Sequence, residues 1–260
     1  MIKYFDQIYY IRVDELKKPR TTLLRQRFEK SLRYFFPAAK YIIVNAVETD
    51  PRLAGGHHVG CAMSHRKVIK HAKSNGYERI LIFEEDALLH LEFGNMLRQA
   101  IKELKTVKWD LFKLGNCVGH ARVNGEYEQY KNCKRIQVEG FGTCTHSYAL
   151  NHTLFDKFLS DLPESEESMR EYVIDPGFTT GATYPGAIDM YMLNQLNADQ
   201  GWNRLVMVPR IVTQDCLSAL TRNVKQDYRW DYYHPGGHDH VNNIKLNTQE
   251  VPGTYEILEN

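Results

Sequence analysis

The chain has 260 residues, and 33 Lys and Arg stand against 32 Asp and Glu, with 43% of all residues hydrophobic. This length suits one compact domain with at most a small appendage, and the balanced charge gives no support to nucleic acid as a partner. No apolar run approaches the roughly 20 residues that span a bilayer, and the N-terminus lacks the apolar core of a signal peptide. We therefore expect a cytoplasmic protein without a transmembrane segment.

Strands alternate with helices through the first half of the chain. Apolar periodicity predicts strands at 7–13, 41–46, 79–83 and 109–115, and helices at 21–34, 59–74 and 91–104. The strand at 79–83 is continuously apolar, which is typical of a sheet buried on both faces. This order predicts an α/β fold, with one Rossmann-like domain whose mixed, mostly parallel sheet is flanked by helices.

The second half of the chain is less regular. It comprises a polar loop or hairpin at 116–132, candidate strands at 136–138, 147–150 and 205–208, helices at 154–162 and 187–197, and a linker or lid at 163–186. We assign residues 1–220 to the main domain. Residues 221–260 are rich in polar, aromatic and His side chains, and we expect this extension to pack on or near the active site.

An acidic turn follows the most apolar strand. Ligands gather at the carboxyl ends of strands in open α/β sheets, which is where Glu84, Glu85 and Asp86 stand. Adjacent carboxylates repel one another, and hard oxygen ligands suit Mg²⁺ or Mn²⁺. In an extended segment Glu84 and Asp86 face one site and Glu85 another. A solvated surface loop is the alternative interpretation of such a triplet.

Other cofactor and redox motifs are missing from the sequence. It contains neither a GxGxxG fingerprint nor a GxxxxGK[ST] phosphate loop, so any nucleotide has to be held in another way. The five cysteines include no CxxC pair, and their number and spacing argue against a disulfide framework or a thiolate zinc site. We expect a reducing compartment.

Two stretches in a fixed order resemble a known family. The segment 58–65, which reads HVGCAMSH, and the segment 80–87, which reads ILIFEEDA, are similar to motifs of glycosyltransferase family 25, the lipooligosaccharide and collagen galactosyltransferase group. Further agreement comes from residues 8–12, 142–150, 185–189 and 208–214, so the resemblance covers about residues 5–220. Arg12 departs from the usual asparagine, and Glu85 from an aspartate.

The resemblance implies an activity and a set of site residues. It implies a GT-A type fold and a metal-dependent, inverting transfer of galactose or glucose from a UDP-hexose to the hydroxyl of a glycan. Asp86 would hold Mn²⁺ or Mg²⁺, Glu84 would face the donor ribose or the metal, and Arg12, Ser64 and His65 would lie near the nucleotide. A lipid-linked acceptor would bring peripheral association with a membrane.

Two further residues are candidates for the chemistry. Asp189 begins a helix after the Gly- and Pro-rich stretch, and it is either the general base that deprotonates the acceptor hydroxyl or a helix cap. His238 stands in a His-rich tail, where it either completes the metal shell or belongs to a flexible segment without function.

Two rival functions remain open at this stage. A metal-dependent phosphohydrolase could be built on the same acidic turn, although the sequence shows no second pair of metal-facing carboxylates. A non-catalytic protein that binds carbohydrate or nucleotide sugar is the other alternative. Nucleotide release with and without an acceptor, and stabilisation by nucleotide sugars, separate these possibilities.

Overall fold

The structure, a computed structural model, describes residues 4–13, 19–37, 40–116, 119–121, 128–178, 182–196, 200–214 and 255–258. Its strands are β1 (Gln7–Arg12), β2 (Tyr41–Asn45), β3 (Arg79–Glu84), β4 (Ala87–Leu89), β5 (Leu111–Lys113), β6 (Gly119–Ala121), β7 (Ile136–Gly142), β8 (Ser147–Asn151), β9 (Arg204–Met207), β10 (Val212–Gln214) and β11 (Tyr255–Leu258). Its α-helices are α1 (Pro19–Phe35), α2 (Gly56–Ser74), α3 (Phe93–Leu104), α4 (Phe155–Asp161), α5 (Glu166–Ile174) and α6 (Ile188–Gln195).

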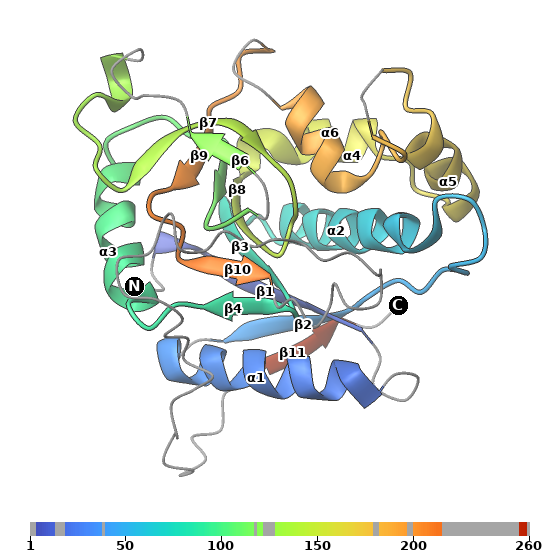
Figure 1. The fold of residues 1–260 in the computed structure, drawn as a ribbon, viewed down its shortest axis with the longest axis horizontal. Coiled ribbons are helices and arrows are strands. Elements are labelled where there is room, and N and C mark those ends of the chain that lie inside the picture. The colour runs from blue at the N-terminus through green and yellow to red at the C-terminus, as the bar shows by residue number, and fades with distance from the viewer. Residues whose placement is uncertain are drawn as a thin grey trace.

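A mixed sheet forms the centre of the fold (Figure 1). Nine of the described strands join it in the order β11-β2-β1-β3-β8-β5-β9-β7-β6, while β4 and β10 form a separate pair. Strands β11, β2, β1 and β3 run parallel, and β8 enters antiparallel between β3 and β5. The predicted α/β class with a mixed sheet flanked by helices is confirmed. The sheet is not mostly parallel, because β7 and β8 run antiparallel to their neighbours: four of its described strand pairs are parallel and four are antiparallel.

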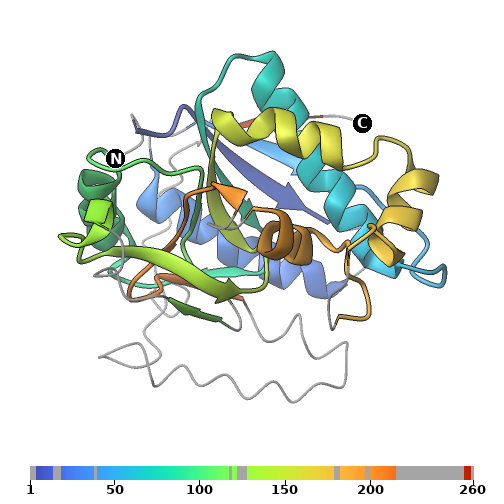
Figure 2. The ribbon, with the colours of Figure 1, turned by 90° about the horizontal axis from the view of Figure 1, so that it is seen from above.

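The two faces of the sheet are covered by different helices. Helices α2, α4, α5 and α6 lie on one face, and α1 and α3 lie on the other (Figures 1 and 2). Alternation along β1 places Tyr9 and Ile11 in the core under α2, and Ile8 and Tyr10 in the core that contains Phe28 of α1. The near-continuous apolar strands are therefore explained by burial on both faces.

The main differences from the predicted elements lie in the loops. Residues 163–186, expected as a linker, contain α5, because Ser165 caps the helix through a bond from the Ser168 amide and Met169 and Val173 are buried. The short strand β4 was not expected, whereas β10 lies in the segment 208–214 that resembles a strand of the family, and α2 begins inside the expected loop at 51–58.

The described end of the chain belongs to the same sheet. Strand β11 pairs in parallel with β2, beside the first strands of the chain. The rest of residues 221–260 lies outside the described residues, so the boundary near residue 220 and the packing of the extension on the site stay predictions. In the part of the chain that the structure describes, no helix combines the length and apolarity needed to span a bilayer.

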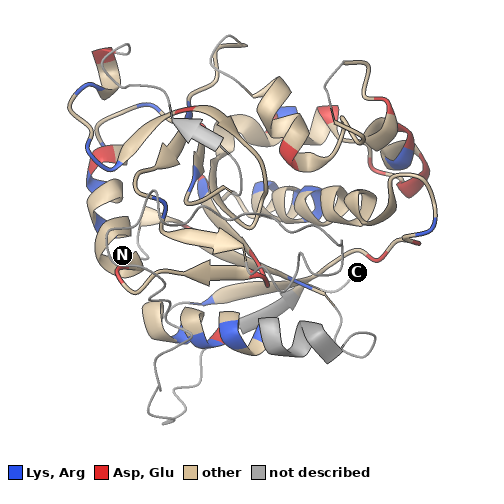
Figure 3. Ribbon diagram, in the orientation of Figure 1, with Lys and Arg blue, Asp and Glu red and all other residues tan. Residues whose placement is uncertain are grey.

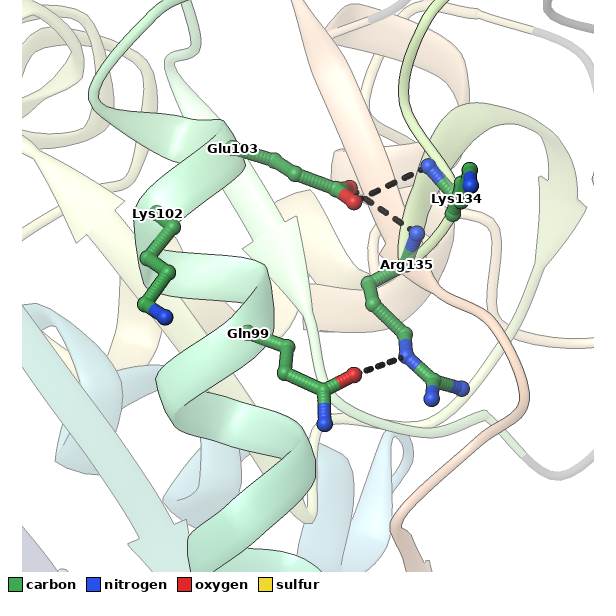
Figure 4. Close-up of a pocket in the computed structure, with 5 residues that line it drawn as sticks. All are labelled: Gln99, Lys102, Glu103, Lys134 and Arg135. Carbon is green, nitrogen blue, oxygen red and sulfur yellow. Dashed lines mark hydrogen bonds between the residues drawn. The ribbon is translucent and has the colours of Figure 1, made fainter.

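A depression of about 480 Å³ lies where α3 meets the start of β7, away from the acidic turn (Figure 4). The carboxylate of Glu103 accepts hydrogen bonds from the backbone amides of Lys134 and Arg135 at 3.0 and 2.8 Å. The guanidinium of Arg135 donates to Gln99 at 2.7 Å. These bonds fasten β7 to α3, which gives the polar lining of the depression a structural role.

Candidate active site

The acidic turn joins the end of β3 to β4, near the middle of the molecule (Figure 3). Glu84 is the last residue of β3, and its amide donates to the carbonyl of His146 at 3.0 Å. Strand β4 then pairs antiparallel with β10. The turn is thus held on one side by the β7–β8 connection and on the other by β10, at the carboxyl edge where the sequence predicted a ligand site.

Glu84 is fixed by hydrogen bonds from two elements. Its Oε1 lies 3.0 Å from Nε2 of His65 on α2 and 2.5 Å from the hydroxyl of Thr145. The other ring nitrogen of His65 lies 2.7 Å from the hydroxyl of Tyr148. Burial raises the pKa of Glu84, but the hydrogen bonds and charge of His65 and the Thr145 hydroxyl outweigh it and hold the pKa below its usual value. Glu84 is therefore an oriented carboxylate that favours the ionised form.

Glu85 points away from this cluster. Its side chain is buried and accepts a hydrogen bond from the amide of Val13, just after β1, at 3.0 Å. Burial is the main reason that its pKa is raised to about 8, with smaller contributions from the charges of Asp86 and Glu84. The expected split of the triplet is observed. The bond through which Glu85 fastens the end of β1 to the turn was not predicted.

Asp86 is oriented by β10. The amide nitrogen of the Gln214 side chain donates to Oδ2 of Asp86 at 2.8 Å. Strand β10 can lie this close because Gly115 has no side chain. A Cβ at that position would stand 1.8 Å from the carbonyl oxygen of Val212, which no rotamer relieves. Gly115, just after β5, therefore determines where Gln214, the partner of Asp86, lies.

Asp189 lies in the first turn of α6. Its Oδ2 accepts the amide of Cys144 at 3.1 Å, and its Oδ1 accepts the amide of Met190 at 2.9 Å. Cys144 has a φ of 70°, an uncommon conformation for a residue other than glycine, and such residues concentrate at functional sites. The N-cap of α6 is Ala187, so Asp189 is not the N-cap itself. Its bonds to two backbone amides are compatible with either a base or a structural carboxylate.

The three carboxylates are linked through one segment between β7 and β8. The amide of Cys144 donates to Asp189 and the hydroxyl of Thr145 donates to Glu84, while the Cys144 Sγ lies 3.8 Å from the Gln214 side chain that holds Asp86. The acidic turn and the start of α6 therefore face one region. Burial raises the pKa of the Cys61 thiol well above its usual value, and the charges of Glu84, Asp189 and Asp86 raise it further. A concentration of negative charge at the carboxyl edge of β3 is what a divalent cation would neutralise.

Three of the predicted nucleotide contacts have partners within the protein. Ser64 is buried, accepts the amide of Val47 at 2.8 Å and donates to the carbonyl of Gly60 at 2.6 Å. His65 is also buried and supports Glu84 as described. Arg12, at the end of β1, donates to the side chain of Asn45 at 3.1 Å. The geometry gives Ser64 and His65 supporting roles within the protein, and their place near a nucleotide stays a prediction, as does that of Arg12. His238 lies outside the described residues.

One cysteine differs from the expectation of free thiols. Cys144 is disulfide-bonded, whereas Cys61 and Cys133 form no disulfide. Its partner lies outside the described residues. The expectation from number and spacing was therefore wrong for Cys144, because residues far apart in sequence can meet in the fold.

Three residues that organise the site were not predicted from the sequence. Thr145 and Tyr148 hold Glu84 and His65, and Gln214 holds Asp86. All three stand in segments that resemble the family motifs, 142–150 and 208–214, and this was the available signal. Their roles depend on contacts between distant segments, which spacing alone does not reveal.

Comparisons with known proteins identify a family for part of the chain. The model of glycosyltransferase family 25 (LPS biosynthesis protein) matches residues 43–170, which contain α2, β3 and β8. The human "inactive glycosyltransferase 25 family member 3" is 30% identical over 108 residues, and the bovine "probable inactive" member is 28% identical. Each match covers 40% of this chain and 18% of the relative, so the chain matches under a fifth of their length.

Solved structures of related arrangement include transferases. One is a glycosyltransferase involved in the glycosylation of the major capsid of PBCV-1, with a TM-score of 0.42, 9% identity, and coverage of 77% of this chain and 81% of that one. Another is the mannose-1-phosphate geranyltransferase from Thermus thermophilus, with a TM-score of 0.42, 12% identity, and coverage of 81% and 76%.

Proposed function

Because residues 43–170 form a glycosyltransferase family 25 domain, we propose that this protein transfers a hexose, galactose or glucose, from a UDP-sugar to the hydroxyl of a glycan acceptor. The observation that carries the proposal is the convergence of Glu84, Asp86 and Asp189 on one region at the carboxyl edge of β3, where contacts of Cys144, Thr145 and Gln214 link them. Transfer needs a stabilised leaving diphosphate and a group that accepts the proton of the acceptor hydroxyl.

The residues present fit a hard divalent cation such as Mn²⁺ or Mg²⁺. Asp86 and Glu84 offer carboxylate oxygens from one turn, and each is oriented by a neutral side chain, Gln214 or Thr145. When bound there, the cation would act as a Lewis acid on the diphosphate. In this proposal Asp86 is the principal ligand, and Glu84 serves the metal or the donor ribose.

Asp189 is the proposed general base. Two backbone amides hold its carboxylate, so it presents a fixed acceptor for the proton of the attacking hydroxyl. Inversion of the anomeric centre follows if the hydroxyl attacks on the face opposite the diphosphate. The base and the metal ligands come from different elements, α6 and the β3–β4 turn, which leaves the donor and acceptor to meet between them.

Nucleotide release in the presence of Mn²⁺ tests the proposal. The full chain is incubated with UDP-galactose or UDP-glucose, with and without a panel of glycan acceptors, and UDP is quantified. Asp86→Asn and Asp189→Asn should each lower acceptor-dependent release by about 100-fold or more. Glu167→Gln, at an exposed position on α5, is the control and should keep full activity. Normal turnover by Asp86→Asn would refute the metal assignment, and normal turnover by Asp189→Asn would refute the base.

A non-catalytic role is the second candidate. The curated relatives that match residues of this domain are named inactive, which favours a protein that binds a nucleotide sugar or glycan without transferring the sugar. Binding without turnover distinguishes this candidate. It predicts that UDP-hexose and Mn²⁺ raise the melting temperature although no acceptor promotes UDP release.

A further inference from the structure

A second set of potential metal ligands lies beside the acidic turn. The Sγ of Cys61, a ring nitrogen of His65 and a carboxylate oxygen of Glu84 all lie within 4.8 Å of one another. From these residues we propose a site for a transition metal of the zinc class, distinct in its donor set from the oxygen site at Asp86. The proposal concerns binding and does not depend on sugar transfer.

The local structure brings these donors together. Cys61 and His65 are four residues apart on α2, so they lie on the same face of the helix, one turn apart. Glu84 approaches from the end of β3, with its Oε1 3.0 Å from Nε2 of His65. His65 is fully buried, while Cys61 and Glu84 are residues of intermediate burial.

The distances suit tetrahedral coordination. With bond lengths of about 2.0–2.3 Å, two ligand atoms of a tetrahedral zinc site stand about 3.4–3.6 Å apart. The His65–Glu84 pair therefore has to open by about half an ångström, and the longest separation has to close by roughly 1.3 Å at most. Rotation of the Cys61 and Glu84 side chains can supply both movements.

The surroundings of His65 also match those of a metal ligand. Ligating imidazoles usually bond through the second ring nitrogen to a fixed polar partner, and Nδ1 of His65 lies 2.7 Å from the Tyr148 hydroxyl. With Nδ1 bonded to that hydroxyl, Nε2 faces Glu84 and Cys61, and it offers its lone pair to a metal once the proton that it donates to Glu84 is released. Tyr148 is fully buried, so packing holds its hydroxyl in place beside His65.

The donor set decides the kind of metal. A thiolate and an imidazole favour Zn²⁺ or Co²⁺ over Mg²⁺, which prefers oxygen ligands. On binding, the S–H bond of Cys61 and the Nε2–H bond of His65 break, sulfur and nitrogen keep their electron pairs and bind the metal, and both protons pass to solvent. The two negative ligands then balance the charge of the cation. The charges of Asp86 and Asp189 around the thiol add to the attraction.

Cobalt absorption tests the site directly. The chelator-treated full chain is titrated with Co²⁺, and the thiolate-to-cobalt charge-transfer band in the near ultraviolet is followed. The band should appear with the wild type and be lost in Cys61→Ser. Cys133→Ser, which removes the other described cysteine that forms no disulfide, and Asp86→Asn should keep it. Tyr148→Phe should weaken Co²⁺ binding about 10–100-fold. Absence of the band in the wild type, or its persistence in Cys61→Ser, overturns the proposal.

Alkylation of the wild type provides a measurement that does not depend on the folding of a variant. Zn²⁺ should slow the modification of Cys61 by about tenfold or more, measured by peptide mass spectrometry, and leave Cys133 unchanged. Equal rates at Cys61 with and without Zn²⁺ would overturn the proposal. Because neither readout involves a sugar, loss of transferase activity and loss of this site are distinguishable.

Discussion

Replacing Glu139 by Gln should destabilise the protein strongly. Glu139 is the buried anion between two buried cations. Its carboxylate oxygens lie 2.9 Å from Nε of Arg204 and 3.7 Å from Nζ of Lys113. All three side chains are at most 4% exposed. Gln has nearly the same shape, so the substitution removes the charge and leaves Lys113 and Arg204 close together without a counter-ion.

The expected magnitude follows from the burial of the pair. Breaking a buried ion pair by removing one partner costs about 3–5 kcal/mol of unfolding free energy. For a chain of this size, that lowers the melting temperature by roughly 6–20 °C. The change also reaches the site, because Arg204 donates to the carbonyls of Met192 and Leu193 in the last turn of α6, the helix that carries Asp189.

Denaturant unfolding at neutral pH, with thermal melting as a second measure, checks this prediction. Glu128→Gln is the matched control, because Glu128 forms an ion pair with Lys131 but its side chain is 85% exposed, and it should have little effect. Adding Lys113→Met to Glu139→Gln should recover part of the lost stability, since one unpaired cation is then removed. If Glu139→Gln were no more destabilising than Glu128→Gln, the buried charge cluster would not contribute as argued.

Two further predictions concern the acidic turn. Gly115→Ala should displace β10, because the added Cβ would collide with the carbonyl of Val212, and this would move Gln214 away from Asp86. The variant should therefore bind Mn²⁺ more weakly than the wild type when measured by calorimetry. An unchanged affinity for Mn²⁺ would contradict this prediction. Glu85→Gln should change the pH dependence of stability, measured with a chelator present. The folded-state pKa of about 8 exceeds the usual 4.5, so the wild type holds a proton that the unfolded chain releases. Its stability should therefore be full below pH 4.5 and fall by up to about 5 kcal/mol toward pH 8, and a variant with the same slope as the wild type would contradict the assignment.

The sequence predicted the elements that have strong periodicity. Strands 7–13, 41–46 and 79–83 are found within one residue as β1, β2 and β3, because apolar runs buried on both faces have few alternatives. The acidic turn was placed at the correct sheet edge for the same reason. Helix α5 was missed because its acidic first turn resembles a linker, although Ser165 and the spacing of Met169 and Val173 carried the signal.

The site itself was only partly predictable. Alternation along an extended segment separates Glu84 and Asp86 from Glu85, and this needs no tertiary information. The residues that bond to these carboxylates cannot be identified without tertiary information. Thr145 and Gln214 are 61 and 128 residues away from the acids they contact, and neither spacing nor composition encodes such a meeting. The close approach of β10 to Gly115 is likewise visible only in the three-dimensional structure.

The pairing of β11 with β2 has a consequence for synthesis of the chain. Strand β2 ends at Asn45, but the strand that covers its open side begins at Tyr255. Until β11 is made, the backbone N–H and C=O groups along that side of β2 have no strand beside them, and such an edge can pair with another chain. A nascent chain folds from its N-terminal side first, so this edge stays uncovered while the residues between β2 and β11 are made. Stalled or prematurely ended chains would therefore be more prone to associate with one another than the finished protein.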